Sequence, residues 1–167
     1  MTRITATIVV IVLAATAIVW LWPRSESEKV QGQSTQNESG QPRLELSATS
    51  ADLGEMGVQD EKTATFTLKN TGTKALELKQ FSTSCNCTFA QLKTPSQTSP
   101  MFNMMMHMSA ADMNWKTELN PGEEATLSVI YKPSLMPVYG PVQRFVTFET
   151  DDPEHKKVEL TINAQVK

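Results

Sequence analysis

Hydrophobic and polar residues alternate in short runs along most of the chain after residue 42. The runs with a period of two are 64–68, 76–79, 127–131, 146–148 and 158–166. Side chains two positions apart lie on the same face of a β-strand, so each run predicts a strand with one buried face. Between two of these runs, Pro121 and Gly122 stand where a type II turn favours them. We therefore expect an all-β fold, an antiparallel β-sandwich of about seven strands over residues 43–167.

The first 42 residues follow a different pattern. Residues 4–22, nineteen in all, carry no charge and end in Trp20 and Trp22. This length can span a bilayer, and tryptophan is typical of the membrane interface. We expect residues 1–22 to form a transmembrane helix that anchors the chain in a membrane; cleavage after the small residues 15–17 is the alternative. Residues 23–42 are polar and predict a flexible linker.

Composition and motifs narrow the class of function. The chain has 15 basic and 18 acidic residues, and its formal net charge is −3. No cluster of basic residues could neutralise several phosphates, which argues against a nucleic-acid partner. The sequence also lacks a glycine-rich phosphate loop, a serine nucleophile elbow and an HExxH helix. We therefore expect a protein that is not an enzyme, and we identify no small-molecule substrate.

Several short motifs, taken in their order and spacing, resemble a known family. They are DLGEMG at 52–57, TFTLKNTG at 65–72, LEL at 76–78, TSCNCT at 83–88 and PGE at 121–123. This series resembles the bacterial Ig-like family catalogued as domain of unknown function 1573, which is similar to Hydin-type immunoglobulin-like modules. The resemblance implies an Ig-like sandwich on the extracytoplasmic side, in the bacterial periplasm or at the cell surface, with no established activity. Relative to the family, Asn86 replaces a usual glycine, and residues 94–114 are an insertion.

Cys85 and Cys87 are the only cysteines of the chain. On an extended segment, residues i and i+2 point to the same side, so both sulfurs can face one partner. Three hypotheses fit this spacing. The pair could bind a soft metal, since thiolates select Cu(I) or Zn; it could close a small, redox-labile disulfide; or it could pack without a chemical role.

Six of the nine methionines lie inside the insertion. They are Met101, Met104, Met105, Met106, Met108 and Met113. Thioether sulfur is a soft, neutral ligand that suits Cu(I) or Ag(I), and His107 could add a nitrogen ligand. Alternatively, the i, i+3, i+4, i+7 spacing of Met101, Met104, Met105 and Met108 is typical of a short amphipathic helix that packs on the sandwich. Sensing of oxidation through methionine sulfoxide is a third hypothesis.

The leading hypothesis from the sequence is a membrane-anchored domain that binds a soft metal ion, Cu(I). The expected ligands are Cys85, Cys87, Met101, Met104, Met105, Met106, His107 and Met108. The alternative is a non-catalytic interaction module for another envelope protein, in which no metal binds and the methionine-rich loop is an apolar contact surface. His155 lies in a polar turn, where we expect a solvated loop histidine.

Overall fold

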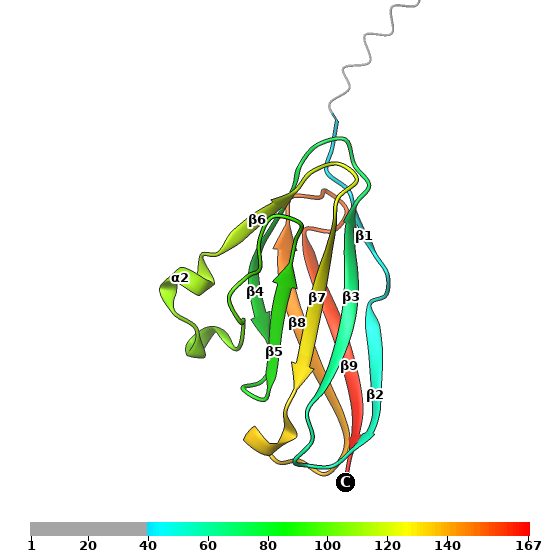
Figure 1. The fold of residues 1–167 in the computed structure, drawn as a ribbon, viewed down its shortest axis with the longest axis vertical. Helices are drawn as coiled ribbons and strands as arrows, with labels where there is room; N and C mark the ends of the chain where they lie inside the picture. Colours follow the sequence, from blue (N-terminus) through cyan, green and yellow to red (C-terminus); the bar gives the residue numbers. More distant parts are fainter. Residues whose placement is uncertain (1–39) are drawn as a thin grey trace, which may run out of the picture. The chain divides into compact units, whose positions relative to one another are not determined.

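The computed structural model of the chain describes residues 40–167 (Figure 1). The predicted membrane anchor, and the predicted linker up to residue 39, lie outside the described residues. The strands are β1 Leu44–Leu46, β2 Ser50–Met56, β3 Lys62–Asn70, β4 Leu76–Thr83, β5 Thr88–Lys93, β6 Lys116–Leu119, β7 Glu124–Tyr131, β8 Gly140–Thr150 and β9 Lys157–Val166. The short helical segments are η1 Met105–His107, α2 Ala110–Met113 and η2 Pro133–Leu135. In this part of the chain, no helix is long and apolar enough to cross a membrane.

The strands form two sheets that pack face to face. One sheet has the order β1-β3-β7-β5, and the other has the order β2-β9-β8-β4-β6. Residues that alternate along each strand fill the space between the sheets, as Phe66 and Leu68 of β3 and Leu127 and Val129 of β7 do. The all-β sandwich expected from the period of two is confirmed. Its nine strands in residues 40–167 exceed the seven or so predicted, because β1 and β6 are only three and four residues long, too short to stand out as periodic runs in the sequence.

One strand pair departs from the predicted antiparallel sandwich. β2 and β9 are parallel neighbours, with Ala51 opposite Ile162 and Met56 opposite Val166. The N-terminal segment first pairs with β3 as β1 and then crosses to the other sheet as β2. One segment thereby provides backbone partners for an edge of each sheet, which would otherwise expose unpaired N–H and C=O groups.

The insertion continues the sheet that ends at β5. Ala90 of β5 and Phe102 exchange two backbone hydrogen bonds of 3.0 and 2.8 Å, and the Ser99 N–H donates to the Leu92 carbonyl at 2.8 Å. Phe102 is buried, where it stacks on Phe81 with ring centroids 4.8 Å apart. The predicted helix through residues 101–108 is therefore wrong. The backbone around Phe102 is extended because it pairs with β5, and only the short η1 and α2 follow.

Candidate functional site

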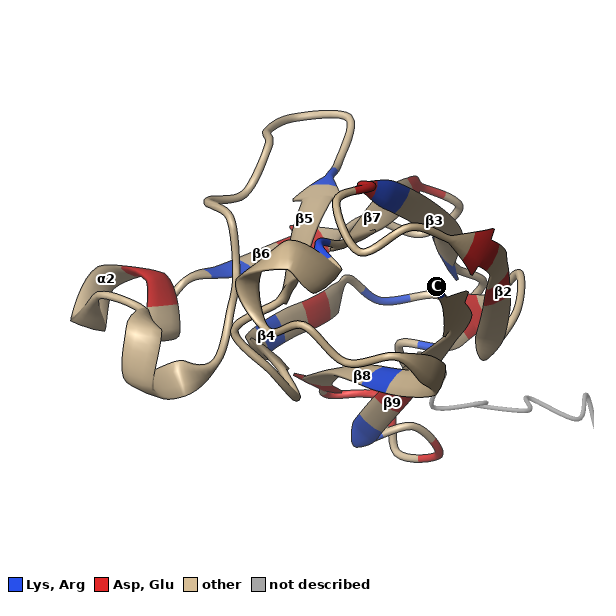
Figure 2. Cartoon of the chain, turned by 90° about the horizontal axis from the view of Figure 1, so that it is seen from below, with Lys and Arg blue, Asp and Glu red and all other residues tan. Residues whose placement is uncertain are grey.

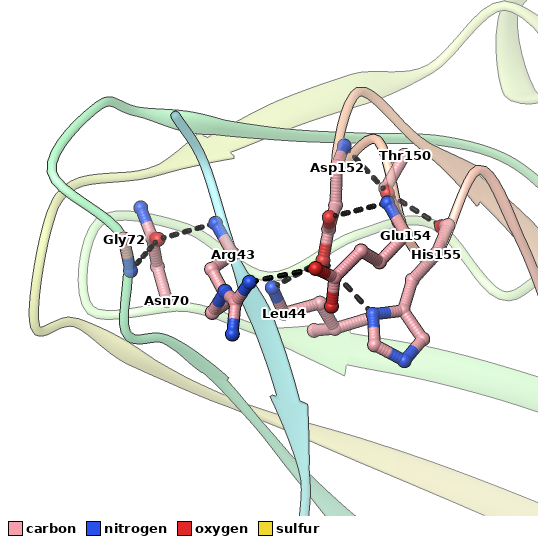
Figure 3. Close-up of polar contacts among 8 residues, drawn as sticks. All are labelled: Arg43, Leu44, Asn70, Gly72, Thr150, Asp152, Glu154 and His155. Atoms are coloured by element: carbon pink, nitrogen blue, oxygen red, sulfur yellow. Dashed lines mark hydrogen bonds and ion pairs between the residues drawn. The ribbon is translucent and has the colours of Figure 1, made fainter. Parts of the chain in front are cut away.

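The end of the sandwich at which Gly40 enters is held by buried polar groups; we call it the polar end. Asp152 is 1% exposed and accepts hydrogen bonds from the N–H groups of Leu44 and Glu154, both at 2.8 Å (Figure 3). His155 Nδ1 lies 2.9 Å from the same carboxylate. Burial raises the pKa of Asp152, but these hydrogen bonds outweigh it, so the net pKa lies below its ordinary value. His155 is an exposed loop histidine, as expected, and its ring is in addition paired with a buried carboxylate.

Asn70 is the second buried polar group at the polar end. Its side-chain amide donates to the carbonyl groups of Lys74 at 2.7 Å and Leu119 at 2.8 Å. Its side-chain oxygen accepts from Gly72 N–H at 2.9 Å (Figure 3). A Cβ atom at Gly72 would overlap the backbone of Arg43, so this close approach of two segments requires glycine. Asn70 and Asp152 thus use their polar atoms to hold the chain together.

The opposite end of the sandwich carries the largest group of exposed apolar side chains. We call the connection between β7 and β8, residues 132–139, the distal loop; it lies at the bottom of Figure 1 and is seen end-on in Figure 2. Its exposed apolar residues, with their exposed fractions, are Leu135 at 50%, Met136 at 45%, Val138 at 43% and Tyr139 at 68%. Four such residues within five positions form an apolar surface that nothing in the described residues covers.

The distal loop is anchored at its base. The Lys132 N–H donates to the carbonyl of Cys87 at 2.9 Å, and the Lys132 ammonium pairs with Glu61 at 2.7 Å. The same ammonium lies 5.6 Å from the centre of the Phe89 ring. The N–H of Met136 closes η2 on the Pro133 carbonyl at 3.0 Å. These contacts hold the backbone of the loop, and its apolar side chains point to solvent. The Lys132–Glu61 ion pair lies at one edge of this apolar surface.

Cys85 and Cys87 lie beneath this loop and form a disulfide. Cys85 is 6% exposed and Cys87 is fully buried. The Thr88 hydroxyl lies 3.3 Å from Cys85 Sγ, and the Cys87 N–H donates to the same sulfur at 3.2 Å. Of the three hypotheses for this spacing, the structure shows the disulfide. In this state neither sulfur is a thiolate, the form in which cysteine binds metals.

A half-buried cation lies next to the disulfide. Arg144 of β8 stands between the buried Val142 and Val146, so its side chain belongs to the inner face of the sheet. Its Nε–H donates to Cys87 Sγ at 3.4 Å, and its guanidinium carbon lies 5.8 Å from the centre of the Tyr131 ring. The sequence analysis missed Arg144. The signal was there, since an arginine occupies an apolar position in the alternation of residues 142–148.

The methionine window occupies a different part of the molecule. Of the expected ligands in it, Met101, Met105, Met106 and His107 are exposed, whereas Met104 and Met108 are half-buried. Met105, Met108 and Met113 line one groove of about 390 Å³, whose other wall includes Gln80 and Glu149. Figure 2 shows the insertion with a single acidic residue, Asp112 on α2. The cysteines do not line this groove, so the expected ligands are not gathered in it as one set.

Within residues 40–167, no group of three or more His, Cys, Asp and Glu side chains is arranged to hold a metal ion. Those side chains are the usual protein ligands for Zn and for harder cations. This result does not bear on a soft ion bound by thioethers, because methionine is not one of these four residue types. Binding of Cu(I) therefore stays a prediction.

Two packed sheets, with a first segment that contributes a strand to each, define an Ig-like β-sandwich. The profile of HYDIN/CFA65/VesB-like, Ig-like domains matches residues 42–165, and the chain belongs to this family. The narrower assignment to domain of unknown function 1573 stays a prediction. No functionally curated protein matches the sequence.

Solved structures share the fold at low sequence identity. A protein of unknown function from Porphyromonas gingivalis W83 is similar at a TM-score of 0.55 and 17% identity, covering 74% of this chain and 46% of that one. A family 123 glycoside hydrolase from Clostridium perfringens is similar at 0.51 and 9% identity, over 75% of this chain and 27% of the hydrolase. The ASH/PapD-like domain 7 of human CEP192 gives 0.48 and 14% identity, with coverages of 76% and 87%. This chain spans about half the length of the Porphyromonas protein and about a quarter of the hydrolase. At these identities, the likeness to both structures shows the fold alone.

Proposed function

We propose that this chain is a non-catalytic protein-interaction module of the bacterial envelope, anchored by residues 4–22, and that its distal loop docks another envelope protein. The single observation that carries the proposal is the exposed apolar group of the distal loop, from Leu135 to Tyr139. Loops at the ends of a rigid sandwich are the usual place of recognition in such folds.

The chemistry of the loop favours a protein as the occupant. Protein interfaces combine an apolar centre that is rich in tyrosine and methionine with a polar rim. Tyr139 and Met136 supply that centre, and the Lys132–Glu61 ion pair stands at its edge. An anionic lipid surface would instead require unpaired basic residues, and the one lysine of the loop is neutralised by Glu61. The partner we expect therefore offers an apolar surface of its own.

The position of the loop supports the same partner. Gly40 enters the sandwich at the polar end, and the distal loop lies at the other end (Figure 1). An anchor before residue 40 would attach the domain to the membrane by the polar end. The distal loop is then at the end of the domain remote from the point of attachment, which leaves it open to another protein.

The proposal can be tested by photo-crosslinking in cells. The aromatic crosslinker benzoylphenylalanine is introduced at Tyr139, whose side chain is 68% exposed, and at the exposed Thr73 of the polar end as the matched control. We expect a discrete adduct from position 139 that mass spectrometry assigns to one other protein, and none from position 73. An adduct only with lipid, an adduct only with a second copy of this chain, or equal labelling from both positions would contradict the proposal.

A second candidate function rests on one observation, the presence of three methionines in the lining of one groove. Met105, Met108 and Met113 line its wall, and methionine has three rotatable bonds that let the sulfurs adapt to an ion. Thioethers bind soft monovalent ions such as Cu(I) and Ag(I). We propose this trio, without the disulfide-bonded cysteines, as the soft-metal site that the methionine window predicts.

Silver(I) is the suitable probe, because it needs no reductant and leaves the disulfide intact. In the chain labelled with ¹³C at the methionine methyl groups, Ag(I) should shift the signals of Met105, Met108 and Met113. Replacing these three with leucine should abolish binding, and replacing the exposed Met101 and Met106 with leucine should not. Binding that is independent of pH between about 5 and 8 is also expected, since thioethers carry no competing proton. Shifts confined to Met101 and Met106, or no binding, would overturn this candidate.

A further inference from the structure

We infer that the Cys85–Cys87 disulfide is an exchangeable redox site: a dithiol reduces it by attack on Cys85 Sγ, and Arg144 holds the Cys87 thiolate that departs. The inference concerns the inner face of the sandwich beneath the distal loop. It does not depend on what the distal loop binds or on whether the methionine groove holds a metal.

The first support is the lack of a counter-charge for Arg144. Its Nε–H points at Cys87 Sγ at 3.4 Å, and its Nη1 donates to the Gln143 carbonyl at 2.9 Å. Among residues 40–167, no carboxylate lies within ion-pair distance of this guanidinium. The partly buried guanidinium is thus held by a sulfur, a carbonyl and an aromatic ring, and not by an anion. A thiolate on Cys87 would supply the missing negative charge.

The second support is an unused donor close to the same side chain. The Tyr131 hydroxyl is buried and has no hydrogen-bond partner among the described residues. Buried hydroxyl groups without a partner are uncommon in folded proteins. Tyr131 lies on the inner face of β7, opposite Thr88 of β5, and its ring lies under the Arg144 guanidinium. The unpaired Tyr131 hydroxyl thus lies in the same part of the interior as Arg144, where the Cys87 thiolate would form.

The burial of the two sulfurs determines which one is attacked. Cys85 is 6% exposed, and Cys87 is fully buried. Cys85 is the more exposed residue of the buried pair, so the inference places the attack on Cys85 and makes Cys87 the leaving group. Exchange is faster when the leaving sulfur is stabilised as a thiolate, and a neighbouring arginine provides that stabilisation.

The chemical step balances with the dithiol as reductant. One thiolate of the dithiol attacks Cys85 Sγ, the Cys85–Cys87 bond breaks, and its electron pair passes to Cys87 Sγ beside Arg144. The second thiol of the reductant, as its thiolate, attacks the mixed disulfide and releases Cys85 as a thiolate, which takes a proton from water. Two electrons pass to the protein disulfide, and the dithiol becomes a disulfide.

The test measures the rate at which dithiothreitol reduces the disulfide of the folded full chain, by alkylation of the released thiols and mass spectrometry. Arg144→Met keeps much of the aliphatic side chain and removes the charge; we expect the rate to fall about ten-fold or more, the scale of one charged hydrogen bond. Arg144→Lys should recover most of the rate. Arg43→Met is the matched control, because it makes the same substitution at an exposed arginine that pairs with Glu154, and its rate should equal that of the unchanged chain.

A second measurement requires no variant. Glutathione, a monothiol, is added to the unchanged chain, and the mixed disulfide is trapped with acid and located by peptide mapping. We expect glutathione on Cys85. Glutathione on Cys87, equal rates for Arg144→Met and the unchanged chain, or reduction that occurs only after the chain is unfolded in urea would each overturn the inference.

Discussion

At the polar end of the sandwich, Asn70 and Asp152 are buried and their polar atoms are satisfied by backbone groups of neighbouring segments. At the distal end, Leu135 and Tyr139 are half or more exposed, and backbone hydrogen bonds hold the loop at its base and within η2. Side chains at the first end contribute to the free energy of unfolding. Those at the second end contribute little to it, which is typical of a surface kept for a partner.

The largest loss of stability is expected from Asn70→Ala. The substitution leaves the buried Leu119 carbonyl and the Gly72 N–H without their partner, at about 1–3 kcal/mol for each unsatisfied group. We predict a fall in the free energy of unfolding of about 3 kcal/mol, measured by urea denaturation. Asn163→Ala is the control, since its side chain makes one exposed hydrogen bond, from Gln143, and it should change the free energy of unfolding by less than about 0.5 kcal/mol. Similar losses for both variants would show that the polar end is not the anchor we describe.

Asp152→Asn should have a smaller effect that depends on pH. The folded pKa of Asp152 lies below its ordinary value, so the carboxylate stabilises the fold above the unfolded pKa of 3.8 and loses this contribution as the pH falls through the folded value. At pH 7 we expect a loss of about 1–2 kcal/mol, because the neutral amide is a weaker acceptor for Leu44 N–H and His155. Denaturation at pH 7, 5 and 3 should show the two chains converging in acid. A constant difference would contradict this account.

Glu77→Gln should give a smaller change still. Hydrogen bonds from Lys116, at 2.8 Å, and from Lys79, at 2.6 Å, lower the pKa of Glu77 to about 2. The carboxylate therefore contributes stability above pH 4.5, and this is lost as the pH falls toward 2. Both lysines are exposed, so solvent screens the pairs and the loss at pH 7 should be below about 1 kcal/mol. Adding salt should reduce it further; a loss that salt leaves unchanged would point to packing instead.

The smallest effect on stability is expected in the distal loop. Leu135→Ser combined with Val138→Ser removes exposed apolar surface and leaves the backbone contacts of Lys132 and Met136 in place. The free energy of unfolding should change by less than about 0.5 kcal/mol in the same urea experiment. A loss as large as that of Asn70→Ala would mean that the loop is part of the core.

The sequence predicts the sandwich well where strands alternate cleanly, as in residues 64–68 and 158–166. It does not reveal the parallel pairing of β2, because Gly54 and the register shift near it interrupt the alternation and partner choice depends on distant segments. In the insertion, the spacing of Met101, Met104, Met105 and Met108 suggests a helix, yet backbone pairing with β5 prevails over it. The sequence of the distal loop has no hydrophobic periodicity, so it does not predict which of its side chains are exposed. Their exposure depends on η2 and on the contact of the loop with the Cys85–Cys87 turn, which only the structure shows.

The central claim is that the distal end binds and the polar end holds the fold. The most direct test is the affinity of the purified partner identified through the Tyr139 crosslink, measured for the unchanged chain, for Leu135→Ser with Val138→Ser, and for Thr73→Asp at the polar end. We predict a loss of about ten-fold or more for the loop variant, as is typical of apolar residues at the centre of an interface, and no change for Thr73→Asp. Equal affinities for all three chains, or a loss caused only by Thr73→Asp, would contradict the account.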